Sequence, residues 1–202
     1  MSIGIKKISQ PKMIRAFIAL ELKDQQTIEN IRSFSSRLIK NQPKLKVVEP
    51  ENLHLTVKFL GNISESAAPK VYNLLKEEIN EKLFLGKNLE YKLIGAGQFN
   101  RHSVIWIGLK GNIQFLQSIK EAVEDQLNLK LKIQKDKRIK FKPHLTIGRL
   151  KSNKINYKNF DSFKKIIQEN KDLDFGIFNI NQIKLKKSEL TPKGPIYSDL
   201  IY

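Results

Sequence analysis

Two short segments contain the residue types that acid–base catalysis requires. Residues 54–57 (HLTV) are echoed ninety residues later by residues 144–147 (HLTI), so His54 and His144 stand in matching surroundings. Because histidine titrates near neutral pH, one imidazole can accept a proton while the other donates one. Opening a phosphodiester needs this division, since the attacking oxygen loses a proton and the leaving oxygen gains one on opposite sides of phosphorus. We therefore predict that His54 and His144 form an acid–base pair that acts on a phosphodiester.

The threonine of each segment stands two positions after the histidine. In a β-strand, residues i and i+2 point to the same face, so Thr56 shares the face of His54, and Thr146 shares that of His144. A hydroxyl at this place can donate a hydrogen bond to a non-bridging phosphoryl oxygen and stabilise charge in the transition state. The alternative is a structural role, because threonine is a good strand residue.

Three further residues of these segments are candidate RNA contacts. Lys58 stands four positions after His54, so alternation places it on the same face, where it either reaches the phosphate or is solvated. Phe59 and Arg149 each stand five positions after a motif histidine, and a ring with a guanidinium can sandwich a nucleobase. A core position is the alternative for Phe59, because simple alternation puts it opposite His54.

The composition excludes several classes of site. The chain has no cysteine, which excludes disulfides, thiolate nucleophiles, zinc ribbons and iron–sulfur sites. Neither motif is bracketed by the carboxylates that Mg²⁺ or Mn²⁺ needs, and two histidines alone make a poor zinc site. We therefore expect no metal and no other cofactor; a zinc ligand supplied from elsewhere in the fold is the alternative.

The charge balance favours a polyanionic partner. Lys and Arg number 37 against 20 Asp and Glu, which gives a formal net charge of +17. Such an excess attracts phosphates over long range and predicts binding to nucleic acid or to phosphorylated ligands. A generally lysine-rich surface is the alternative.

The chain shows no targeting or membrane segment. No stretch approaches the ~20 consecutive apolar residues of a membrane span, and residues 1–12 lack the apolar core of a secretory signal. We expect a cytoplasmic monomer with no membrane association. Residues 1–12 are interpreted as a mobile basic extension, and residues 13–202 as a single domain. The third histidine, His102, falls in a predicted loop without a partner threonine, and we interpret it as a surface residue.

The hydrophobic pattern predicts interspersed strands and helices. Apolar residues recur at three- and four-residue spacings, typical of helices, in residues 24–40, 64–83, 113–128 and 158–169. Short apolar runs predict strands at 14–20, 45–48, 53–60, 88–96, 103–109, 145–150, 173–187 and 195–201, of which the second and third form a hairpin. No glycine fingerprint follows the first strand, so the class is α+β. The repeated motif predicts two similar lobes that face each other across a cleft.

The chain resembles the two-histidine phosphoesterases, and among them the RNA 2′,3′-cyclic phosphodiesterases once called 2′-5′ RNA ligases, especially archaeal members. A single H-x-T triplet is weak, whereas two copies with their flanks in order are specific. A valine stands ahead of Glu49, where relatives often carry tryptophan. The resemblance spans nearly the whole chain from Met13 and includes residues 15–19 (RAFIA), 50–61 (PENLHLTVKFLG), 104–106 (VIW), 143–149 (PHLTIGR) and 187–197 (KSELTPKGPIY).

The resemblance implies a bilobal fold with a pseudo-twofold cleft and hydrolysis of RNA 2′,3′-cyclic phosphate ends to 2′-phosphates. It also implies weak reversible 2′-5′ joining of RNA ends, without a required metal or nucleotide cofactor. We expect His144 to be the base and His54 the acid. Two alternatives stay open: a non-catalytic module that binds RNA ends, and a phosphodiesterase for a small cyclic nucleotide. The matching motifs imply that His54 and His144 are the catalytic residues and that Thr56 and Thr146 bind the phosphate. They also imply that Phe59 and Arg149 contact the terminal base.

Overall fold

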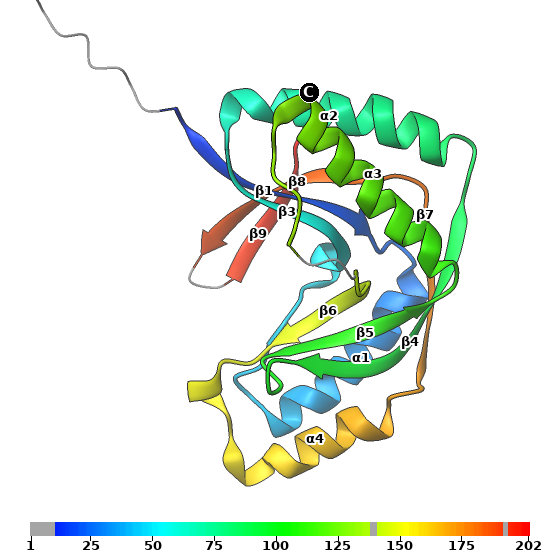
Figure 1. Ribbon diagram of the computed structural model, residues 1–202. Helices are drawn as coiled ribbons and strands as arrows, with labels where there is room; N and C mark the ends of the chain where they lie inside the picture. The colour runs from blue at the N-terminus through cyan, green and yellow to red at the C-terminus, as the bar shows by residue number, and fades with distance from the viewer. Residues whose placement is uncertain (1–10, 138–140, 192–193) are drawn as a thin grey trace, which may run out of the picture.

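The strands of the protein form one curled antiparallel sheet with helices packed against it (Figure 1). The computed structural model describes residues 11–137, 141–191 and 194–202. The predicted α+β class is confirmed. The sheet order is β7-β4-β5-β6-β3-β1-β8-β9, with β2 paired to β6. The strands are β1 (Met13–Glu21), β2 (Lys46–Val47), β3 (His54–Ser64), β4 (Leu89–Phe99), β5 (Val104–Lys110), β6 (His144–Arg149), β7 (Asp174–Ile180), β8 (Lys184–Thr191) and β9 (Gly194–Asp199).

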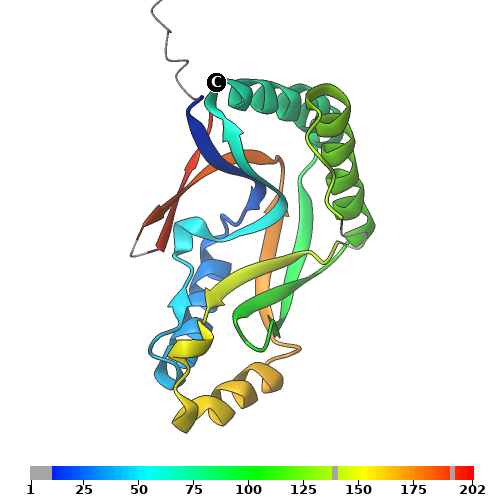
Figure 2. The ribbon, with the colours of Figure 1, turned by 60° about the vertical axis from the view of Figure 1, so that its left-hand side comes forward.

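Two halves of the sheet correspond to the two predicted lobes. One half contains β7, β4, β5 and β6, and the other contains β3, β1, β8 and β9. They join where β3 pairs with β6 through Leu55 and Leu145, and both leucines are fully buried. Figure 2 shows the two halves diverging from this junction. The bilobal arrangement is therefore confirmed as two halves of one continuous sheet.

Each half is covered by one long helix that follows a strand of the other half and by a shorter helix that follows a strand of its own half. Helix α1 (Gln25–Asn41) leaves β1 and packs with α4 (Phe160–Glu169) against β7 and β4. Helix α3 (Ile113–Leu131) leaves β5 and packs against β3, together with α2 (Ala68–Leu74) and its π-helical continuation η3 (Leu75–Phe84). This exchange ties the halves together and buries the apolar sides of the helices that their spacing predicted.

Side-chain caps begin the two long helices. Asp24 Oδ1 accepts a hydrogen bond of 2.8 Å from the Thr27 backbone at the start of α1. Asn112 Oδ1 accepts one of 3.0 Å from the Phe115 backbone at the start of α3. Each bond satisfies a backbone N–H that has no partner inside its helix.

Two predictions about strands were wrong. Residues 45–48 and 53–60 do not form a hairpin: β2 and β3 each pair with β6, because residues Pro50–Asn52 form a 3₁₀ turn between them. Residues 173–187 are not one strand but β7 and β8, which lie in opposite halves of the sheet. The Asn80 side chain bonds the backbone N–H and C=O of Ile183 and fixes the crossing between them. A polar pair, Asn181 and Gln182, interrupts the apolar run there.

Residues 1–10 of the predicted extension lie outside the described residues. The single-domain assignment of residues 13–202 stays a prediction. Within the described residues, none of the helices is both long enough and apolar enough to span a membrane.

Candidate active site

The junction of the two halves brings the paired motifs together. Because Leu55 faces Leu145 in an antiparallel register, His54 lies across from Thr146, and Thr56 lies across from His144. The leucines between them point into the core, and both motif threonines and both histidines are half-buried on the opposite face. The structure therefore unites the four residues that the sequence selected for acid–base and phosphate-binding roles.

The two imidazoles are anchored in the same way. His54 Nδ1 lies 2.6 Å from the carbonyl oxygen of Asn52, and His144 Nδ1 lies 2.7 Å from that of Lys142. A carbonyl only accepts hydrogen bonds, so we assign the proton to Nδ1 in both rings. In the neutral tautomer the lone pair is then on Nε2, an atom that can accept a proton.

His54 lies in an aromatic environment that favours its neutral form. The centroid of its ring lies 5.0 Å from that of Phe17 on β1 and 5.3 Å from that of Tyr197 on β9. Burial lowers the pKa of His54 to about 4, and the positive charges of Lys186 and Arg149 act in the same direction. His54 is therefore uncharged at neutral pH.

Two aromatic rings also flank His144 in the other half. The centroid of its ring lies 4.9 Å from that of Phe99 on β4 and 6.4 Å from that of Trp106 on β5. Gly97 makes room for the indole, because a Cβ at this position would lie 2.2 Å from Trp106 Cζ2. Each histidine is thus held by two aromatic rings from other strands of its own half.

Matching β-bulges determine which side chains share the histidine face. Within the described strands, Val57 on β3 has no partner on β1, and the equivalent Ile147 on β6 has none on β5. An extra residue reverses the alternation beyond it. Phe59 therefore returns to the face of His54 and is 57% exposed, so the core position that simple alternation gave it was wrong. Arg149 is exposed beyond the second bulge.

The bulge turns Lys58 away from the histidines. Its side chain is 2% exposed, and its Nζ lies 3.2 Å from Glu124 Oε1 and 3.0 Å from Asp136 Oδ1. Lys120 Nζ lies 2.6 Å from the same Glu124 oxygen and completes a buried network of four charges. The prediction that Lys58 shares the face of Thr56 and reaches the phosphate was therefore wrong; Lys58 ties β3 to α3.

Comparison with known proteins shows the family of the chain. Residues 16–198 match the protein family described as AKAP7 2′5′ RNA ligase-like domain. The chain belongs to this RNA ligase-like family. Its curated relatives include proteins named RNA 2′,3′-cyclic phosphodiesterase from Methanocaldococcus jannaschii and Archaeoglobus fulgidus. The first is 38% identical, covering 91% of this chain and 96% of the relative, and the second is 34% identical, covering 93% and 98%.

Solved structures show that the ligase-like family fold is preserved here. The apo form of E. coli LigT aligns with a TM-score of 0.67 at 21% identity, covering 94% of this chain and 96% of LigT. TT0787 of Thermus thermophilus aligns with a TM-score of 0.68 at 24% identity, covering 93% and 96%. The predicted two-histidine phosphoesterase fold is thus confirmed.

Within this family fold, a charged cluster that sequence reasoning missed flanks His54. Glu21, which pairs with His54 across β1 and β3, and Asp199 on β9 share two lysines. Lys184 Nζ lies 2.6 Å from an oxygen of each carboxylate, and Lys186 bonds both as well. Burial opposes ionisation of Glu21, but these hydrogen bonds hold its pKa below the usual value. In the sequence, the alternation of lysine, leucine and lysine on β8 was the signal that could have predicted this charged cluster.

The sequence suggested that His102 is a surface residue, but its ring is half-buried in the structure. It lies in the β4–β5 turn with a φ of 69°, and its backbone N–H donates a 2.8 Å bond to Gln98 Oε1. Its half-buried ring packs on Phe160 and Phe163 of α4. Packing against α4 explains this histidine without a catalytic role.

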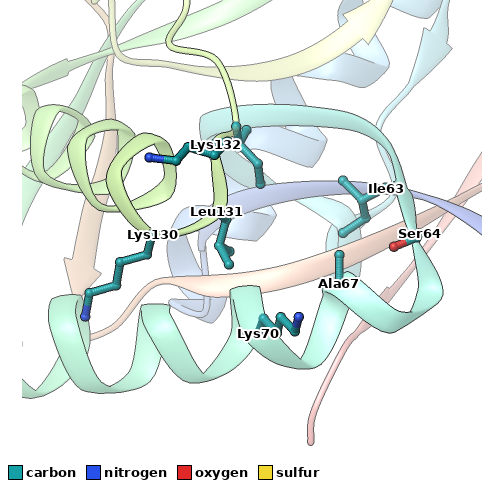
Figure 3. Close-up of a pocket in the computed structure, with 8 residues that line it drawn as sticks. Ile63, Ser64, Ala67, Lys70, Lys130, Leu131 and Lys132 are labelled. Carbon is teal, nitrogen blue, oxygen red and sulfur yellow. The ribbon is translucent and has the colours of Figure 1, made fainter.

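A cavity of about 400 Å³ lies apart from the motifs. It opens between Ala67 and Lys70 at the start of α2 and residues 130–133 at the end of α3 (Figure 3). None of the predicted site residues lines it. In the part of the chain that the structure describes, no three His, Asp or Glu side chains are grouped to hold a metal.

Proposed function

We propose that this chain hydrolyses RNA 2′,3′-cyclic phosphate ends to 2′-phosphates by acid–base catalysis with His54 and His144, without a metal or cofactor. The equivalent Nδ1 anchors carry this proposal, because they orient both rings in the same way and put the lone pair of each neutral ring on Nε2. Water attacks phosphorus and loses a proton to one imidazole. The bond from phosphorus to the 3′ oxygen breaks, and that oxygen takes a proton from the other imidazole.

Thr56 and Thr146 hold the phosphate in this proposal. Each hydroxyl stands beside the histidine of its own strand and across from the histidine of the other strand. Hydrogen bonds from the two hydroxyls to the non-bridging oxygens stabilise the charge that builds on the phosphoryl group. Phe59 and Arg149 sandwich the terminal nucleobase. The two bulges support this role, because both side chains then lie on the histidine face.

The lowered pKa of His54 favours it as the base, which reverses the assignment expected from the sequence. A group with a pKa of about 4 is rarely protonated at neutral pH, so His144 is the better source of the proton for the 3′ oxygen. A substrate with sulfur at the 3′ bridging position tests this assignment, because a thiolate leaves without a proton. It should restore activity to His144→Ala but not to His54→Ala, and the opposite rescue would return the acid role to His54.

The same steps with an RNA 5′-hydroxyl in place of water would join it to the 2′,3′-cyclic phosphate through a 2′-5′ linkage and release the 3′-hydroxyl. The names of the relatives support hydrolysis as the main reaction. A non-catalytic RNA-end-binding module and a phosphodiesterase for small cyclic nucleotides are the rival functions. An oligoribonucleotide with a 2′,3′-cyclic phosphate end, incubated in EDTA and analysed by mass spectrometry, tests the proposal. Conversion to a 2′-phosphate supports it, and tight binding without conversion favours the binding module.

A further inference from the structure

Cations gather at the end of β6, beyond Arg149. Lys46 on β2 is the direct cross-strand partner of Arg149, and both side chains are exposed. Cross-strand partners have Cβ atoms about 5 Å apart on the same face, and like charges in this arrangement destabilise a sheet. A phosphate bound between the two side chains would be attracted by both positive charges.

The β4–β5 turn brings another cation to the same place. Leu150 donates a 3.0 Å backbone bond to the carbonyl of Ser103, which joins the end of β6 to this turn. Arg101 in the turn and Lys151 after β6 are both exposed. Lys46, Arg101, Arg149 and Lys151 together define a surface that we term the β6 rim.

The segments that form the β6 rim contain no carboxylates. Residues 39–48, 91–112 and 141–160 include neither Asp nor Glu. Beside His54, Lys184 and Lys186 are neutralised by Glu21 and Asp199, whereas Arg149 has no ion pair with a described residue. Positive charge therefore remains beside β6, and the exposed Arg15 on β1 acts on Tyr197 on the His54 side.

The β6 rim lies at a suitable distance for the nucleic acid chain behind the terminal nucleotide. Thr146 and Arg149 are three residues apart on β6, which corresponds to roughly 10 Å along a strand. Lysine and arginine side chains extend several ångströms from the backbone and bind phosphates as point charges or through paired N–H groups.

We propose that the β6 rim binds the phosphodiester backbone on the 5′ side of the cyclic phosphate, with Lys46 and Arg101 selecting polymeric RNA over mononucleotides. This inference rests on the proposed hydrolysis and names its substrate class. Each backbone contact releases counterions, so binding of a polymer depends on salt more steeply than binding of a mononucleotide.

The experiment compares two substrates in three variants. The substrates are a nucleoside 2′,3′-cyclic phosphate and an oligoribonucleotide that ends in the same group. Lys46→Gln and Arg101→Gln each remove one charge from the rim. Lys70→Gln removes one exposed charge beside the cavity in Figure 3 and serves as the matched control.

For the oligoribonucleotide, we expect kcat/KM of each rim variant to fall about tenfold at low salt. We expect the slope of its logarithm against log salt concentration to become shallower by about 0.7 for each lost phosphate contact. The mononucleotide rate should be unchanged, and Lys70→Gln should match the wild type on both substrates. Equal losses on both substrates, or no loss on the oligoribonucleotide, would overturn the inference.

Fluorescence anisotropy with a labelled 3′-phosphorylated oligoribonucleotide separates this inference from the proposed function. If the wild type hydrolyses neither substrate, the proposed function fails. Weaker binding by Lys46→Gln than by Lys70→Gln would still support the β6 rim as an RNA surface. Equal binding by the two variants would contradict it.

Discussion

Leu55 and Leu145 face each other as the residue pair that joins the two halves of the sheet, and each leucine separates a motif histidine from its threonine. This pair sets the distance between the motifs. Leu145→Ala should destabilise the fold by about 2–5 kcal/mol, because it leaves a cavity at a fully buried position. Urea denaturation measures this loss, and Leu129→Ala at an exposed position is the control. A change below about 0.5 kcal/mol would contradict the central position of the pair.

Burial of His54 makes stability depend on pH. The folded pKa of about 4 lies below the ordinary value of 6.5, so between these pH values the unfolded chain binds a proton that the folded chain does not. His54 therefore costs up to roughly 3 kcal/mol of stability as the pH falls from 6.5 to 4. Urea denaturation of wild type and His54→Gln across this window should show a shallower decline for the variant. Parallel declines would contradict the lowered pKa.

The buried network of Lys58 predicts a variant that loses stability but not chemistry. Lys58→Met leaves Glu124 and Asp136 with Lys120 as their remaining partner in the network, so we expect a loss of about 3 kcal/mol. Under conditions where the variant is folded, its kcat/KM for the cyclic phosphate should match that of the wild type. A selective loss of kcat/KM in a fully folded variant would return Lys58 to the phosphate site.

Substitution of Phe59 should lower activity without lowering stability, which is the opposite of the effect expected for Lys58. Because its ring is largely exposed, Phe59→Ala should change stability by less than about 0.5 kcal/mol. Loss of base stacking should lower kcat/KM by about 5- to 100-fold, since stacking contributes about 1–3 kcal/mol per base. Leu190→Ala, at an exposed position on β8, is the matched control. A large loss of stability together with unchanged kinetics would make Phe59 a structural residue.

The sequence predicted the parts of the site that follow a regular pattern. His54 and Thr56 share a face because they are two residues apart on a strand, and the repeat of the motif predicted the second pair. The period of the apolar residues also located α1 and α3 to within a few residues.

The rest depends on tertiary pairing that no local pattern encodes. Val57 and Ile147 look like ordinary strand residues, yet each is left without a partner at the neighbouring strand, and the faces of Lys58 and Phe59 follow from that. In the same way, the contact of Glu21 with Lys186 depends on the sheet order β3-β1-β8 rather than on either segment alone.

In the proposed mechanism, both histidines transfer protons at one phosphorus. The direct test is the rate at which wild type, His54→Ala, His144→Ala and the control His102→Ala open an oligoribonucleotide 2′,3′-cyclic phosphate in EDTA. Loss of a general acid or base costs about 10²- to 10⁴-fold, so both motif variants should fall by at least about 100-fold while His102→Ala retains most activity. Near-wild-type rates in either motif variant would contradict the two-histidine mechanism.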